Sequence, residues 1–148
     1  MHRYSTSVVD TALAAATKET VIQVATPSTR KARILEWSVS FDGVTATAEP
    51  VVVRIVRQTG AGTASAAVEN PMDPDFPAAL CTTQTLFTVE PTSDDFFLEA
   101  YNVHPQGGLV LKQYPQGQEI IMDISQFLGI TCTAPAVVNV CASISWEE

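Results

Sequence analysis

The chain has 148 residues and a formal net charge of −8, a length that suits one domain burying about two-thirds of its unfolded surface. No apolar run approaches the ~18 residues of a transmembrane helix, and the acidic balance disfavours nucleic acid. We therefore expect neither a membrane nor a nucleic acid as partner. The first residues lack the basic-then-apolar order of a cleaved signal peptide, so we expect no secretion by that route.

The 17 valines and 17 threonines favour strands throughout the chain. Apolar residues alternate with polar or small ones in most segments, and proline or glycine stands at most segment ends. In chain order the patterns predict nine strands, at 3–9, 19–26, 32–42, 50–58, 85–90, 96–104, 109–114, 119–124 and 136–146. The first could instead be an extended arm. We assign residues 1–18 to an N-terminal arm or linker and 19–148 to a single domain.

The segments 32–42 and 50–58 have informative patterns. One face of the first collects its large apolar side chains, which are Leu35, Trp37, Val39 and Phe41. Both faces of the second are partly apolar, which predicts an interior strand or one whose outer face meets a partner.

Two long stretches lack strand periodicity. Residues 59–83 carry two glycines and three prolines, and a loop of this length is usually functional or packed against a partner. Residues 125–135 contain Phe127, Leu128 and Ile130, so we expect a packed crossover there. Eight or nine short antiparallel strands with two long crossovers predict an all-β, two-sheet sandwich of jelly-roll type. An immunoglobulin-like sandwich is the alternative.

Residues that could carry chemistry are sparse. The cysteines, Cys81, Cys132 and Cys141, have no metal-binding spacing, and Cys132–Cys141 is the one disulfide that we consider. His104 at a predicted strand end is read as a turn residue, and Asp73-Pro74-Asp75 as a solvated turn. We therefore expect no catalytic residues, no cofactor and no metal site.

The layout resembles the small jelly-roll head decoration, or cement, proteins of tailed bacteriophages. Four features carry the resemblance: the N-terminal segment Met1–Val9, the strand pair Ile34–Gly43 and Val51–Arg57, the insertion Thr59–Ala79, and the final strand ending in Trp146-Glu147-Glu148.

The resemblance implies a homotrimer on the outer surface of a virion, made in the host cytoplasm, that binds the major capsid protein and stabilises the head. We expect the N-terminal segment and the long loop to make these contacts. The candidate capsid or subunit contacts are Arg3, Tyr4, Val8, Met72, Asp73, Phe76 and Trp146. The alternative is a tail- or fibre-associated jelly roll that binds a host-surface glycan near 104–108 and Tyr114. A jelly-roll enzyme of the cupin type would need several histidines, and the chain has two.

Overall fold

The computed structural model describes residues 1–43 and 49–148, and this part of the chain contains strands and no helix. The strands are β1 (Arg3–Leu13), β2 (Lys18–Ala25), β3 (Ala32–Asp42), β4 (Val51–Gln58), β5 (Thr63–Ala66), β6 (Asn70–Pro71), β7 (Thr82–Val89), β8 (Ser93–Val103), β9 (Gln106–Gln113), β10 (Ile120–Met122), β11 (Phe127–Thr133) and β12 (Val138–Glu147). All pairings between these strands are antiparallel.

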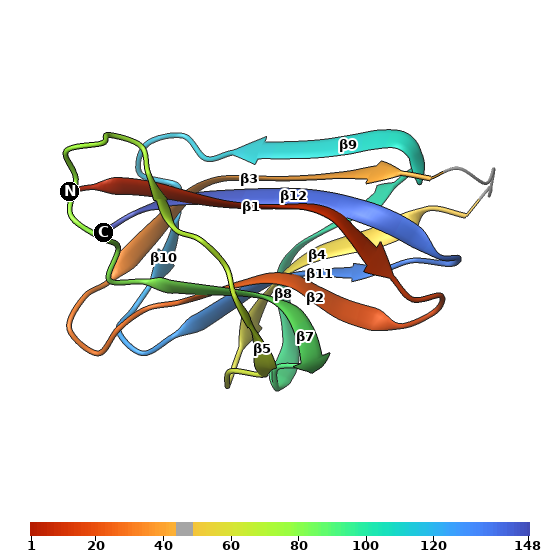
Figure 1. The fold of residues 1–148 in the computed structure, drawn as a ribbon, viewed down its shortest axis with the longest axis horizontal. Coiled ribbons are helices and arrows are strands. Elements are labelled where there is room, and N and C mark those ends of the chain that lie inside the picture. The colour runs from red at the N-terminus through yellow and green to blue at the C-terminus, as the bar shows by residue number, and fades with distance from the viewer. Residues whose placement is uncertain (44–48) are drawn as a thin grey trace.

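The strands form two sheets that pack face to face (Figure 1). In the first sheet, β1, β12, β3 and β9 are neighbours in that order, and β6 and β10 are added at its edges. In the second sheet, β2, β11, β4 and β8 are neighbours in that order, and β7 and β5 extend it beyond β2. Along the chain, the eight main strands follow the order of a jelly roll: consecutive strands lie in opposite sheets, except β4 and β8, which pair within the second sheet. The predicted fold class is confirmed.

The nine predicted strands correspond to β1–β4, β7–β10 and β12, and the structure adds β5, β6 and β11. The prediction for 50–58 is also confirmed, because β4 lies between β11 and β8. The alternating apolar residues became strands because one face of each could be buried against the opposite sheet.

The assignment of residues 1–18 to an arm or linker is wrong for most of that segment. β1 pairs with β12 from Arg3 to Leu13, with a register shift between Val8 and Thr11. Asp10 has a positive φ of 53° at this shift, as in a β-bulge. The strand predicted at 3–9 is confirmed, because Tyr4, Thr6 and Val8 alternate into the core.

The crossover expected at 125–135 is instead the strand β11, which lies between β2 and β4 at the centre of the second sheet. Its side chains Leu128, Ile130 and Cys132 are buried. Gly129 interrupts the alternation, which hid the strand. A Cβ at this position would lie 2.6 Å from Oε1 of Gln58, so the missing side chain makes room for the glutamine.

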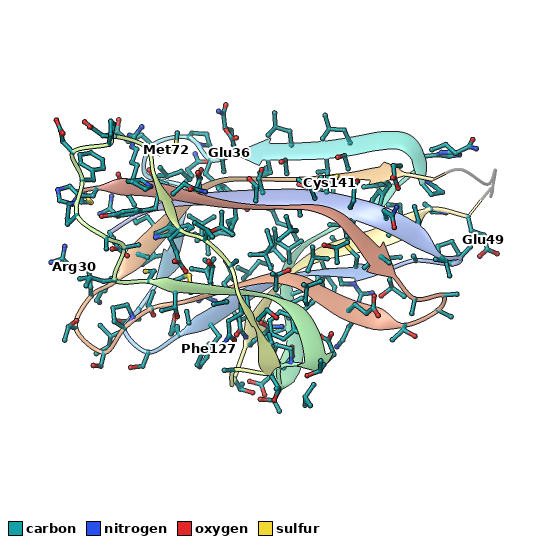
Figure 2. All side chains as sticks on the ribbon, viewed as in Figure 1. Arg30, Glu36, Glu49, Met72, Phe127 and Cys141 are labelled. Carbon is teal, nitrogen blue, oxygen red and sulfur yellow. The ribbon has the colours of Figure 1, made fainter. Side chains whose placement is uncertain are left out.

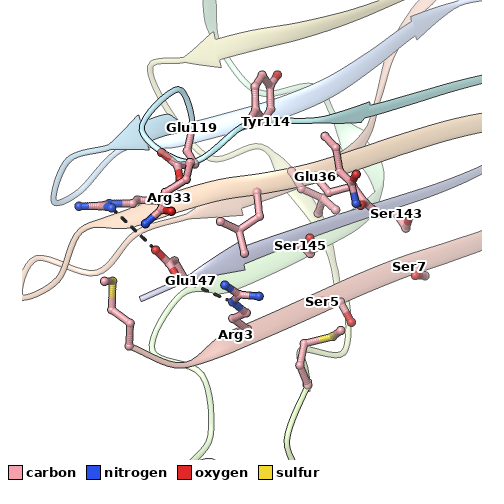
Figure 3. A pocket seen from close by; sticks show the side chains of 16 residues that line it. Arg3, Ser5, Ser7, Arg33, Glu36, Tyr114, Glu119, Ser143, Ser145 and Glu147 are labelled. Atoms are coloured by element: carbon pink, nitrogen blue, oxygen red, sulfur yellow. Dashed lines mark hydrogen bonds and ion pairs between the residues drawn. The ribbon is translucent and has the colours of Figure 1, made fainter.

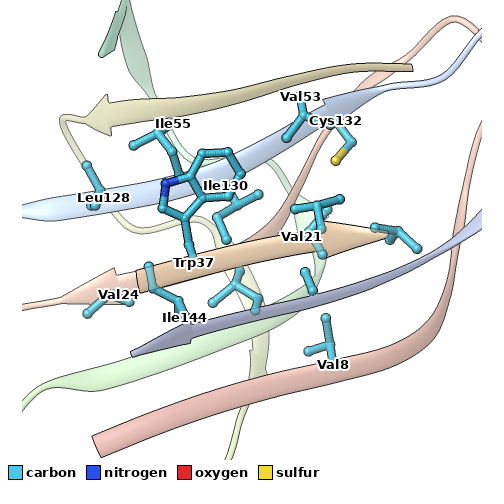
Figure 4. Packing of buried hydrophobic residues seen from close by; sticks show 14 of the residues in the cluster. Val8, Val21, Val24, Trp37, Val53, Ile55, Leu128, Ile130, Cys132 and Ile144 are labelled. Atoms are coloured by element: carbon cyan, nitrogen blue, oxygen red, sulfur yellow. The ribbon is translucent and has the colours of Figure 1, made fainter. Parts of the chain in front are cut away.

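The core lies between the sheets and is centred on Trp37, which is fully buried (Figure 4). Trp37 also contacts Tyr101 of β8 in the opposite sheet, with ring centroids 5.8 Å apart. Leu35 does not share the inward face of β3 with Trp37 as predicted. A register shift opposite Ser145 and Trp146 places Ile34 in the core instead.

Candidate interaction surfaces

The long stretch 59–83 is an ordered insertion whose second half is clamped to the sandwich. The carboxylate of Glu148 accepts hydrogen bonds from the amides of Leu80 (2.6 Å) and Cys81 (2.8 Å). Tyr4 donates its hydroxyl proton to the carbonyl of Pro77 at 2.9 Å. These contacts tie residues 77–81 to both termini, which lie side by side in Figure 1.

Further contacts hold the insertion along β1. The Thr6 hydroxyl donates to the carbonyl of Val68 at 2.8 Å, and the amide of Met72 donates to the carbonyl of Arg3 at 2.9 Å. The Glu69 carboxylate accepts from the Thr83 amide at 2.6 Å. We call residues 67–83 the clamped insertion. It covers the outer edge of β1 from Arg3 to Thr6.

The buried carboxylate of Glu148 remains charged in this setting. Burial raises the pKa of Glu148, but hydrogen bonds from the Cys81 thiol and from the amides of Leu80 and Cys81 outweigh it, and the pKa is lowered. Burial, together with the neighbouring carboxylate, raises the pKa of the Cys81 thiol. The clamp is therefore the Glu148 carboxylate anion, held by neutral hydrogen-bond donors from Leu80 and Cys81.

Three of the predicted contact residues are buried inside the protein. The exposed fractions of Tyr4, Val8 and Trp146 are 1%, 8% and 0%. Their period-two positions face the core, so the prediction that they contact a capsid or another subunit is corrected.

The other four predicted contact residues lie together at the clamped insertion or beside it. Arg3, Met72 and Asp73 are exposed, and Figure 2 shows Met72 on the outside of the insertion. Phe76 is half-buried beneath the ring of His2, at a centroid distance of 4.4 Å. The N-terminal residues and the insertion thus meet on one surface.

The opposite lateral side is open. Among the described residues, β8 pairs only with β4 and β9 only with β3, so each strand leaves one row of backbone groups unpaired. We call the exposed apolar side chains on these strands the open edge. They are Phe96, Phe97, Leu98, Leu109 and Leu111. Sequence alternation alone could not reveal this surface, because exposure of these residues depends on which strands end the sheets.

A polar network connects the two sheets behind the open edge. Glu99 accepts hydrogen bonds from the hydroxyls of Tyr101 (3.0 Å) and Tyr114 (3.1 Å). Trp37 donates to the Tyr114 hydroxyl at 3.1 Å, and the Lys112 ammonium lies 4.0 Å from Glu99. Burial and the Glu99 carboxylate raise the pKa of Tyr101. The network fixes the tyrosine rings and holds the sheets together at the open side.

A groove lies on the outer face of the first sheet, near the chain termini (Figure 3). Its volume is about 680 Å³, and its floor is formed by β1, β12 and β3. Met72 of the insertion lines one side, and residues 113–119 line the other. Tyr114 is thus at a groove, as the alternative function expected. The segment 104–108 forms the β8–β9 turn at the other end of the sandwich (Figure 1).

The remaining candidate residues take structural positions. Nδ1 of His104 accepts a hydrogen bond from the amide of Gln106, and Asp73 accepts one from the amide of Asp75, so both lie in turns. All three cysteines are free.

Within residues 1–43 and 49–148, no cluster of three or more His, Cys, Asp or Glu side chains could hold a metal ion. The same residues include no helix long and apolar enough to span a membrane.

Comparison with protein-family models, with curated proteins and with solved structures finds no match to this chain. Function is therefore inferred from the clamped insertion, the open edge and the groove.

Proposed function

We propose that the protein is a structural component of a virion that binds the outer surface of a phage head as a decoration protein. The observation that carries this proposal is the placement of its exposed apolar side chains. Among the described residues, eight of the fifteen large exposed apolar side chains lie on two ordered surfaces at opposite lateral sides of the sandwich, the clamped insertion and the open edge. Contiguous exposed apolar surface on a folded domain is typical of protein–protein contact.

The two surfaces suit two kinds of contact. The clamped insertion presents Val68, Met72 and Leu80 on backbone that is already ordered, so docking on a capsid would cost little conformational entropy. The open edge presents five apolar side chains beside unpaired strand backbone, which suits contact with other copies of the chain. Three copies turned with this edge towards a common axis would bind the shell through three insertions, and their contacts would reinforce one another by multivalency.

The first test is the copy number of the chain in purified virions of the phage that carries its gene, measured by quantitative mass spectrometry against the major capsid protein. Hundreds of copies per particle are the expected result. Absence from particles, or a gene without any viral context, would overturn the proposal. A handful of copies would place the chain at the tail or a vertex and would also overturn the decoration function.

Variants separate the two surfaces. Met72→Asp should reduce binding to capsids while the oligomeric state in solution, measured by light scattering, stays unchanged. Leu111→Asp on the open edge should lower the oligomeric state. Val137→Asp is the matched control, because Val137 is 72% exposed and lies outside both surfaces. Equal effects of all three variants would contradict the assignment of the surfaces.

A further inference from the structure

The groove on the first sheet exists because its floor lacks large side chains. Ser5 pairs with Ser145, and Ser7 pairs with Ser143, across β1 and β12. Ser143 continues the row to Ser38 of β3, with their hydroxyl oxygens 2.6 Å apart. Larger residues from the insertion and from the β9–β10 connection rise on either side. The result is a trough of about 680 Å³, which is within the size range of small-molecule sites.

Planar polar groups line both ends of this trough. At one end, the Glu147 carboxylate lies between the guanidinium groups of Arg3 (3.8 Å) and Arg33 (3.9 Å). At the other, the Gln113 amide donates to the Glu36 carboxylate. Figure 3 shows Arg3, Arg33, Glu147 and Glu36 along the groove. Each guanidinium carries five donors, and both arginine side chains remain substantially exposed, so donors are left for a ligand.

The groove also offers apolar contact. Tyr114 is among the lining residues, but its ring packs towards the core, where its hydroxyl is bonded to Trp37 and Glu99 at 3.1 Å each. The side chains of Leu35 and Met72 line it as well. The strand shift that removed Leu35 from the core thus supplies an apolar group at the groove.

The charges of the lining narrow the class of ligand. Two positive side chains, Arg3 and Arg33, stand against three negative ones, Glu36, Glu119 and Glu147, which leaves a net charge of −1. Such a mixed lining gives neither a polyanion nor a polycation a strong attraction. Hydroxyls, carboxylates, carboxamides and guanidinium groups together match a ligand with many neutral donors and acceptors, and the apolar groups match its C–H faces.

We propose that this groove binds a neutral oligosaccharide. The inference goes beyond the decoration function, because it concerns the outer face of the first sheet, which shares only Met72 and its neighbour Arg3 with the insertion surface, and it does not depend on capsid attachment. The saccharide hydroxyls would bond to the serine floor and to the planar groups at the two ends. A sugar ring would pack against Leu35 or Met72.

The test is a two-dimensional amide NMR titration of the isolated full chain with uncharged tri- and tetrasaccharides of glucose, galactose, mannose and N-acetylglucosamine. At least one should give saturable shifts confined to β1, β3, β12 and residues 113–119. Ser7→Tyr, which places a large ring on the groove floor, should weaken that binding by at least about tenfold. Thr82→Tyr is the matched control, an exposed strand hydroxyl of the second sheet, and should leave binding unchanged.

If Ser7→Tyr does not fold, Glu36→Ala tests the same site by removing a planar acceptor, and binding should again weaken. Lack of saturable shifts with every uncharged oligosaccharide would overturn the proposal. So would shifts that lie on the open edge, or binding that both groove variants leave intact. Tighter binding of sulfated oligosaccharides or of an unrelated peptide would overturn the ligand class. The titration contains no capsid, so its failure is distinct from failure of the decoration function.

Discussion

The clamp at Glu148 gives the sharpest test of how the insertion is held. In Glu148→Gln, the side chain keeps one acceptor oxygen and turns an NH2 group towards the second backbone donor. The Leu80 and Cys81 amides, now bound at 2.6 and 2.8 Å, cannot both be satisfied. Glu148 is 6% exposed, so water cannot easily replace the lost acceptor.

The expected cost follows from this loss. A buried hydrogen bond to a charged group contributes about 1.5–3 kcal/mol, and an orphaned amide adds its own desolvation penalty, so we expect Glu148→Gln to lose about 2–3 kcal/mol. For a domain of this size, that corresponds to a fall in Tm of about 5–10 °C. Opening of residues 76–81 should also increase, because the clamp ties them to the sandwich.

Urea denaturation and limited chymotrypsin digestion measure the two effects. Glu147→Gln is the matched control: it makes the same chemical change one residue away, where the carboxylate forms only long ion pairs with exposed arginines. That control should change stability by less than about 1 kcal/mol. Equal midpoints and equal cleavage after Leu80 for the two variants would refute the clamp.

The same carboxylate predicts a pH dependence. The pKa of Glu148 in the folded protein lies below the ordinary glutamate value of 4.5. Its contribution to stability is therefore fully present above pH 4.5 and is lost as the pH falls through the folded pKa. Acid titration of stability should therefore be flatter in Glu148→Gln than in the parent. An unchanged acid profile would contradict the lowered pKa.

Three further predictions follow from local geometry. Ala16 is exposed with a φ of 57°, so Ala16→Gly should stabilise the protein by about 0.5–1 kcal/mol in urea denaturation, and a loss of stability would contradict the strain. Gly129→Ala should cost about 2 kcal/mol in the same assay, because its Cβ would displace Gln58 from hydrogen bonds to Gln23 and Thr20; a neutral result would show that Gln58 yields freely. The pKa values of all three tyrosines are raised, mainly by burial. The neutral tyrosines therefore stabilise the fold below pH 10, and this stabilisation is lost as the pH rises through their pKa values in the folded protein. Absorbance at alkaline pH should show phenolate forming together with unfolding rather than before it.

Local alternation was enough to predict most strands and the fold class. In 32–42, the side chains of Trp37, Val39 and Phe41 face the core as predicted, because successive residues of a strand point to opposite faces wherever it pairs. The same rule failed at Leu35 and at Gly129. At Leu35 a register shift with β12 changed the parity, and at Gly129 a distant glutamine required the absence of a side chain.

The candidate site was predicted less well, because the contact residues were chosen from segments that looked like a mobile arm and loop. Arg3, Met72, Asp73 and Phe76 do lie at or beside the clamped insertion, as expected of a shared surface. Tyr4 and Val8 are buried because the strand predicted at 3–9 pairs with β12 instead of forming the alternative extended arm.

The sequence by itself determined that the chain is an all-β sandwich, because period-two burial is a property of neighbouring residues. Only the tertiary structure decided where the insertion is clamped, which strand edges are open, and where the groove lies. Those features depend on pairs far apart in the chain, such as Glu148 with Leu80 at a separation of 68 residues and Ser38 with Ser143 at 105. No local pattern encodes such pairs, since they are chosen by the packing of the whole domain.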